Sequence, residues 1–260
     1  MRILLLFVGA MLAATGVLAK EAPPKSELEI LQNYAKDYLK DQYFVKRMTF
    51  GVKINERFYT VETHPAKDTQ EADISVKPGA PSEPTFYFTI ADRQVLYDLD
   101  AGRVNALTLM GKAVDADYAP MDVEVMDGFV APDWFSSDIL PFTFHFWTRG
   151  NPEVVSYAEQ KTRFVHGANM GVFYYQPGLR SAWFDIRKGQ HVNEGEADSS
   201  NPFPSMFILV KGELDAQIGG KEFHFTAGNM LFVPAGVSHE FVNKHKDNAQ
   251  GFLFMFGDGA

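Results

Sequence analysis

The chain has 260 residues, of which 46% are hydrophobic, 14% aromatic and 22% charged. This composition is enough for one large core or two smaller ones, and it excludes disorder as the main state. Acidic residues outnumber basic ones by 33 to 24, so the formal net charge is -9 at pH 7. An acidic chain repels a phosphate backbone, and we therefore expect no nucleic-acid partner.

The N-terminus has the pattern of an export signal. Arg2 precedes an apolar run over residues 3–14, and Val17-Leu18-Ala19 offers small residues at the third and first positions before a cut. The sequence predicts a signal peptide over residues 1–19 and a periplasmic or secreted mature chain without an integral membrane span. The alternative is an uncleaved N-terminal anchor.

Cysteine is absent from the chain. Disulfides, thiol nucleophiles and thiolate metal sites are therefore excluded. A cysteine-free chain with a signal peptide fits a bacterial periplasm better than a eukaryotic secretory route.

The mature chain begins with the pattern of an α+β domain, which we place at residues 20–150. Ser26 and Glu29 have the spacing of a capping box and predict a helix that runs to about residue 40. Alternating apolar residues predict an antiparallel sheet with strands at residues 48–54, 57–63, 72–76 and 85–90. Asp92 is expected to cap a helix that ends at Gly102, and residues 104–110 form a second short helix.

A strongly aromatic segment follows, from Pro141 to Trp147. Such a segment must be buried, as ordinary core, as the seam between domains or as the lining of an apolar cavity. As an exposed patch it would instead serve as an interface with a second copy of the chain. The polar residues 151–161 mark the expected boundary to a second domain at residues 151–260.

The second domain has the pattern of an all-β fold. Short strands separated by Gly and Pro turns are predicted at residues 172–176, 181–187, 206–210, 214–218, 222–226, 230–233, 240–243 and 251–256. Strands at this spacing are typical of a jelly roll or a small barrel.

One motif in this domain is specific. A strand ends at Pro234, a tight turn uses Gly236, and the next strand begins by placing His239 and ends near Asn243. This stretch resembles the second motif of the cupin superfamily, and residues 206–214 resemble the end of its first motif. The resemblance covers about residues 164–257 and implies a jelly-roll barrel whose mouth holds a ligand.

The resemblance also bears on metal binding. Metal-binding cupins take two histidines and a glutamate from the first motif and one histidine from the second, but here the glutamate position falls on Ser205 and the histidine positions fall on residues 198–201. His239 is the ligand that remains, so a metal-poor barrel is implied. The segment 194–202 is longer than in the family, and an alternative is a rearranged site for a divalent transition metal made by His239, His191 and Glu196.

The first domain resembles another family. Residues 85–93, Gly102-Arg103 and Gly111-Lys112 resemble the sterol carrier protein family of non-specific lipid transfer domains, over about residues 27–127. This resemblance implies a hydrophobic tunnel between sheet and helices. The acidic Asp115-Ala116-Asp117 stands where that family has a strand.

These observations favour an exported, non-catalytic protein that binds a hydrophobic small molecule. The sequence leaves the cofactor open between none and, under the first alternative, a divalent transition metal. The candidate ligand-binding residues are His239, Trp183, Phe207, Phe232 and Phe241. The first alternative is a cupin-type metal-dependent oxygenase, isomerase or lyase that uses the rearranged site. The second is a structural scaffold that forms a homodimer through the cupin domain.

Overall fold

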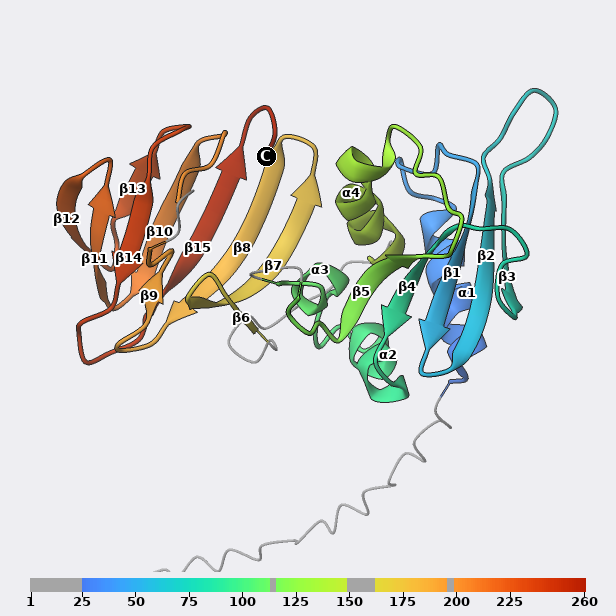
Figure 1. Cartoon of the computed structure of the whole chain (residues 1–260), viewed down its shortest axis with the longest axis horizontal. Helices are drawn as coiled ribbons and strands as arrows, with labels where there is room; N and C mark the ends of the chain where they lie inside the picture. The colour runs from blue at the N-terminus through green and yellow to red at the C-terminus, as the bar shows by residue number, and fades with distance from the viewer. Residues whose placement is uncertain (1–24, 113–115, 149–161, 196–198) are drawn as a thin grey trace, which may run out of the picture.

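The computed structural model describes residues 25–112, 116–148, 162–195 and 199–260, as an N-terminal part with helices and one sheet and a C-terminal part made of strands (Figure 1). The predicted signal peptide and the predicted domain boundary lie outside these residues. Within the described ranges, every helix is too short or too polar to cross a membrane.

The N-terminal part contains a five-stranded sheet. Its helices are α1 (Glu27–Tyr38), α2 (Arg93–Asp100), α3 (Ala106–Leu109) and α4 (Phe135–Trp147). Its strands are β1 (Met48–Ile54), β2 (Arg57–His64), β3 (Asp73–Pro78), β4 (Phe86–Ile90) and β5 (Met121–Val125), in the order β3-β2-β1-β4-β5.

Local sequence signals explain where these elements begin. The Ser26 side chain accepts a hydrogen bond from the Glu29 backbone N–H at 3.2 Å, and the Glu29 carboxylate accepts one from the Ser26 N–H, so the predicted capping box is present. Asp92 caps α2, as expected. The prediction of an antiparallel sheet is wrong at one place, because β1 and β4 run parallel. Alternating side chains specify which face is buried and say nothing of strand direction.

The predicted aromatic segment belongs to α4 and forms core. The ring of Phe50 lies 5.2 Å from that of Phe142 and 5.1 Å from that of Phe146, and both contacts are edge-to-face. Trp147 packs against Tyr34 of α1 at 5.1 Å. In the described part of the chain, these rings occupy the space between sheet and helices where the sterol carrier resemblance implies a tunnel.

The same helix also contacts the C-terminal part. Phe144 lies with its ring 4.8 Å from that of Tyr174. Close by, the Thr108 hydroxyl accepts a hydrogen bond from the Val172 backbone N–H at 2.8 Å, and the Asn105 side chain donates to the Val172 carbonyl. Two helices of the N-terminal part therefore contact one strand of the C-terminal part.

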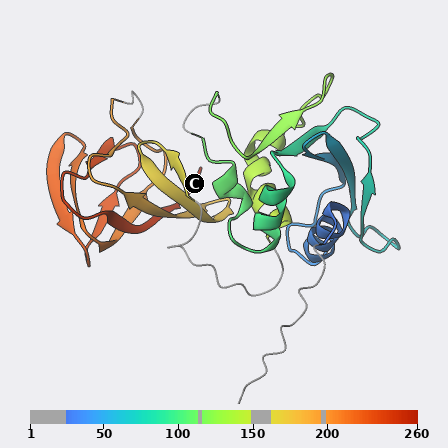
Figure 2. The same ribbon diagram turned by 90° about the horizontal axis from the view of Figure 1, so that it is seen from below.

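The C-terminal part consists of two sheets that pack face to face (Figure 2). The six-stranded sheet has the order β13-β10-β15-β8-β7-β6. Its strands are β6 (Arg163–Val165), β7 (Ala168–Gln176), β8 (Leu179–Ile186), β10 (Ser205–Lys211), β13 (Met230–Val233) and β15 (Ala249–Phe256). The four-stranded sheet has the order β12-β11-β14-β9, made of β9 (His191–Val192), β11 (Glu213–Ile218), β12 (Lys221–Thr226) and β14 (His239–Val242).

The eight predicted strands correspond to β7, β8 and β10 to β15. The predicted jelly-roll barrel requires correction, because the two sheets are not joined by strand pairing into a closed barrel among the described residues. The edge strands β6 and β9 have only 3 and 2 residues, and just beyond them the Asn193 N–H donates to the His166 carbonyl at 3.1 Å. The fold is an open sandwich of two sheets around one apolar core.

The packing of α4 leads to a prediction about stability. Phe146 is fully buried, and Phe146→Ala removes a ring that contacts Phe50, Tyr38 and Trp147. We expect the free energy of unfolding to fall by about 3–5 kcal/mol, because truncating a buried Phe leaves a cavity. Urea unfolding followed by circular dichroism measures this change. The control Val130→Ala, at a side chain that is 86% exposed, should change it by less than about 0.5 kcal/mol, and an equal effect of both variants would contradict the assigned core.

Candidate ligand cavity

A cavity of about 320 Å³ lies between the two sheets of the C-terminal part. Its wall is mainly apolar because every second residue of the surrounding strands points inward. The apolar lining includes Ala168, Met170, Val172, Ala182, Phe184, Ile186, Phe207, Phe241, Leu253 and Met255. The polar groups that reach it come from His166, Arg180, Asn193, Ser199, Asn201 and His239.

His239 is positioned by the predicted turn. Gly236 has a φ of 73°, which favours glycine, and its N–H donates to the Asn201 carbonyl at 2.7 Å. The His239 backbone N–H donates to the Ser199 carbonyl at 3.1 Å. These bonds hold the start of β14 against the segment that precedes β10, so the imidazole enters the cavity.

The imidazole of His239 is buried and neutral. Its Nδ1 lies 3.2 Å from the Val237 carbonyl oxygen, so Nδ1 carries the proton and Nε2 remains an acceptor. Burial lowers the pKa of His239 below its ordinary value, against the weaker raising effect of the Val237 hydrogen bond. His239 thus offers the cavity one acceptor without a charge.

The structure brings together three of the five predicted ligand-binding residues. Phe207 and Phe241 line the cavity beside His239, with each ring centroid 6.0 Å from that of the imidazole. Trp183 lies on the opposite face of β8, where it packs against Phe252 at 5.4 Å. Phe232 is 50% exposed on β13. The strand register decides which face of the sheet Trp183 and Phe232 occupy, and it could not be determined from the sequence.

The alternative metal site is divided between two faces of the sheet. His239 and Glu240 are neighbours on β14, so their side chains point to opposite faces of the sheet. On the outer face, the His191 Nε2 lies 3.4 Å from the Glu240 carboxylate. His191 therefore lies away from the cavity that His239 lines. Glu196 lies outside the described residues.

Arg180 is a cavity residue that the sequence analysis did not select. Its guanidinium lies between the rings of Tyr175 and Phe203, at 4.6 and 5.0 Å from their centroids, and donates to the Gly259 carbonyl at 3.0 Å. Its Nε is buried and has no hydrogen-bond partner within the described ranges. A buried donor of this kind needs an acceptor from outside the protein, such as a water or a ligand. No motif that the sequence analysis used includes Arg180.

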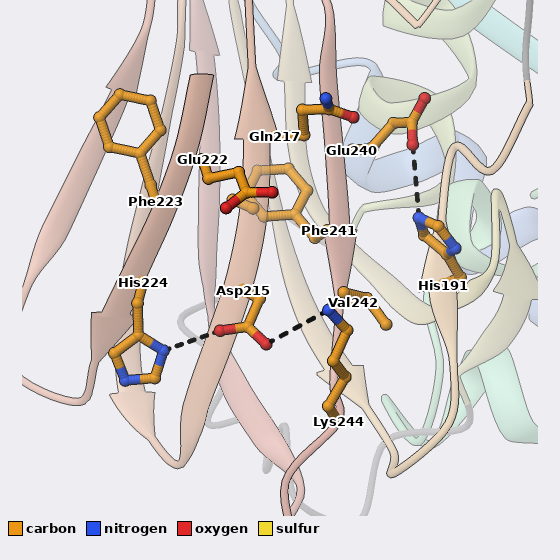
Figure 3. Close-up of a pocket in the computed structure, with 11 residues that line it drawn as sticks. His191, Asp215, Gln217, Glu222, Phe223, His224, Glu240, Phe241, Val242 and Lys244 are labelled. Atoms are coloured by element: carbon orange, nitrogen blue, oxygen red, sulfur yellow. Dashed lines mark hydrogen bonds and ion pairs between the residues drawn. The ribbon is translucent and has the colours of Figure 1, made fainter. Parts of the chain in front are cut away.

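A second hollow, of about 630 Å³, lies on the outer face of the four-stranded sheet (Figure 3). Polar side chains dominate it: His191, Asp215, Gln217, Glu222, His224, Glu240 and Lys244. Asp215 accepts a hydrogen bond from His224 at 2.9 Å, which is the main cause of its lowered pKa. The groove is lined by charged and polar side chains, whereas the wall of the cavity between the sheets is mainly apolar.

The burial of His239 leads to a prediction about pH. Since its pKa is lowered on folding, the unfolded chain takes up a proton at a higher pH than the folded chain does. The free energy of unfolding therefore keeps its full value above the ordinary histidine pKa of 6.5. It decreases as the pH falls below that value, by at most about 1.4 kcal/mol per pH unit. Urea unfolding at pH 7.5 and pH 5 should show a smaller pH effect in His239→Gln than in the natural chain.

A histidine on the N-terminal sheet supplies the control for this measurement. His64→Gln removes an imidazole from the end of β2 and should leave the pH effect of His239 in place. The explanation fails if His239→Gln has the same pH dependence as the natural chain.

Comparisons with known proteins find similarity in the C-terminal part of the chain. Residues 184–255 match the family model described as cupin domain. A Cupin 2 conserved barrel domain protein from Salinispora arenicola CNS-205 is 17% identical, covering 41% of this chain and 90% of that one, with a TM-score of 0.36. An RmlC-like cupin from Shewanella frigidimarina NCIMB 400 is 20% identical, covering 40% and 91%, with a TM-score of 0.34.

A third solved structure is a predicted oxalate decarboxylase from Thermotoga maritima, 16% identical over 40% of this chain and 98% of that one, with a TM-score of 0.36. No curated protein matches the chain. The comparisons give no support to the sterol carrier resemblance of the N-terminal part. Residues 184–255, within the C-terminal part, are therefore similar to a cupin domain.

Proposed function

We propose that this chain is an exported, non-catalytic binding protein that holds a small molecule with an apolar body and a polar end in the cavity between the cupin sheets. The observation that carries the proposal is the mainly apolar cavity wall with a neutral His239 and a buried Arg180 Nε that lacks a partner among the described residues. Apolar walls with a few polar groups are typical of small-molecule sites.

The size of the cavity limits the ligand. A volume of about 320 Å³ lies at the lower end of the range of about 300–1,000 Å³ for small-molecule sites. We therefore expect a single compact ligand of a few hundred daltons or less, rather than a peptide.

The polar groups indicate what the ligand carries. The Nε2 of His239 accepts, so it suits a hydroxyl or N–H of the ligand, and the Nε of Arg180 donates, so it suits a ligand oxygen. A hydroxyl or carboxyl group on a hydrocarbon body satisfies these requirements. His239 and Arg180 would hold such a ligand by hydrogen bonds, without forming or breaking a covalent bond, and we therefore propose a non-catalytic role.

Native mass spectrometry of the chain, purified from an exported preparation without a metal-affinity tag, tests the proposal. The native mass should exceed the denatured mass by that of one organic molecule. Ala182→Phe places a ring in the cavity and should reduce the bound fraction at least tenfold. The matched control Val210→Phe adds the same ring to the exposed outer face of β10 and should retain the ligand.

Other results would contradict the proposal. Equal retention by the two variants would place the ligand elsewhere. An excess equal to one transition-metal ion that disappears in His239→Gln would favour the metal-dependent enzyme instead. The denatured mass also tests export, because cleavage after Ala19 gives a chain that begins at Lys20, whereas an uncleaved chain would contradict the predicted signal peptide.

The scaffold role is a second candidate, supported by an apolar surface. Val210, Met230 and Phe232 are large apolar side chains, each about half exposed, on the outer faces of β10 and β13. An apolar sheet face of this kind is typical of an interface. The same native spectra report the oligomeric state, and a homodimer that dissociates in Phe232→Glu would support this role, whereas a monomeric natural chain would exclude it.

A further inference from the structure

A cluster of possible metal ligands lies at one end of the outer face of the four-stranded sheet. It consists of Glu213 at the start of β11, His224 on β12 and His245 in the loop after β14. One ligand atom from each of the three lies within 4.8 Å of those from the other two. The cluster faces away from the cavity between the sheets.

Strand pairing brings the first two residues together. His224 is the cross-strand partner of Asp215, and Glu213 lies two residues before Asp215, on the same face of β11. The third residue, His245, is held by the buried side chain of Asn243. The His245 backbone N–H donates to the Asn243 side chain at 2.9 Å, and Asn243 in turn donates to the Ile186 and Asp247 carbonyls at 2.8 and 2.9 Å. The ligand set is therefore fixed before any ion binds.

Hydrogen bonding prepares His224 as a ligand. Its Nδ1 lies 2.9 Å from the Asp215 carboxylate, to which it donates, and its Nε2 lies 3.3 Å from the Glu213 carboxylate. Metal-binding histidines commonly donate their second N–H to a carboxylate in this way, which orients the ring and raises its basicity. Asp215 is thus a positioning residue.

The contacts of Glu213 with the two histidines are longer than usual hydrogen bonds. Glu213 Oε2 lies 3.3 Å from the His224 Nε2 and Glu213 Oε1 lies 3.4 Å from the His245 Nδ1, beyond the usual hydrogen-bond range of about 2.7–3.2 Å. One ligand atom from each residue lies within 4.8 Å of the others, which is close enough for all three to reach one ion after small side-chain adjustments. The buried Nε2 of His245 has no hydrogen-bond partner in the described part of the chain, and Asp215 is 3.6 Å from it.

Charge also favours a cation here. Glu213 and Asp215 are two carboxylates beside two imidazoles, and the nearby Lys244 contacts only the other oxygen of Asp215, at 3.8 Å. Two imidazoles with a carboxylate suit zinc, nickel, copper or cobalt rather than magnesium or calcium, which prefer oxygen ligands. The half-exposed side chains of Glu213 and His224 leave room for a water as the fourth ligand.

We propose that Glu213, His224 and His245 bind one divalent transition-metal ion, with Asp215 positioning His224. The ion would link the loop after β14 to the hairpin formed by β11 and β12, and so stabilise this end of the sheet. This site is independent of the proposed ligand cavity, since none of its residues lines that cavity.

Titration of the full chain with Co²⁺ tests the proposal, after purification without a metal-affinity tag and removal of metal with a chelator. We expect one equivalent to bind, with the visible absorption of four-coordinate Co²⁺, and Zn²⁺ to displace it. His224→Gln and Glu213→Gln should each weaken binding at least tenfold, and Asp215→Asn by about 10–100-fold. Circular dichroism verifies that each variant is folded.

The same sheet face provides a matched control. His191 lies between the carboxylates of Glu194 and Glu240, at 3.2 and 3.4 Å, and His191→Gln should leave Co²⁺ binding unchanged. The proposal is overturned if the natural chain shows no saturable binding at micromolar Co²⁺, if His224→Gln binds as well as the natural chain, or if binding is lost in His191→Gln or His239→Gln instead. Failure of this test leaves the organic ligand in the cavity detectable by mass, so the two proposals stand or fall separately.

Discussion

The alternation of side chains along β14 is the constraint on which the rest of the C-terminal part depends. His239 and Phe241 point into the apolar cavity, while Glu240 and Val242 line the polar outer groove. A shift of one residue in the register would exchange the two sets and bury a carboxylate. The turn at Gly236 and the backbone bonds of residues 199 and 201 prevent that shift. One strand therefore separates the mainly apolar cavity from the polar face that carries the proposed metal ligands.

The N-terminal part contributes to the same cavity through β7. Val172 lines the cavity with its side chain, and its backbone is hydrogen-bonded by Asn105 and Thr108. Phe144 of the aromatic helix α4 packs on Tyr174 of the same strand. The N-terminal core thus stabilises one wall of the candidate site, although no residue of that core enters it among the described residues.

Strong local signals made most of the fold predictable from the sequence. The capping box at Ser26, the cap at Asp92 and the turn before His239 each depend on a few neighbouring residues, and all are found as expected. Helix α4 was not predicted because Pro141 lies inside it and argues against a helix. The proposed metal ligands Glu213, His224 and His245 were missed for another reason. They come from two paired strands and a loop, so only the register brings them together.

The proposed function depends most on an occupied cavity between the two sheets of the C-terminal part, and a crystal structure of the chain, purified without added ligand, tests this most directly. We predict continuous electron density for one organic molecule in the cavity, with a polar atom within hydrogen-bond distance of the His239 Nε2 or the Arg180 Nε. A cavity that is closed by repacked side chains, or that holds only water, would contradict the account.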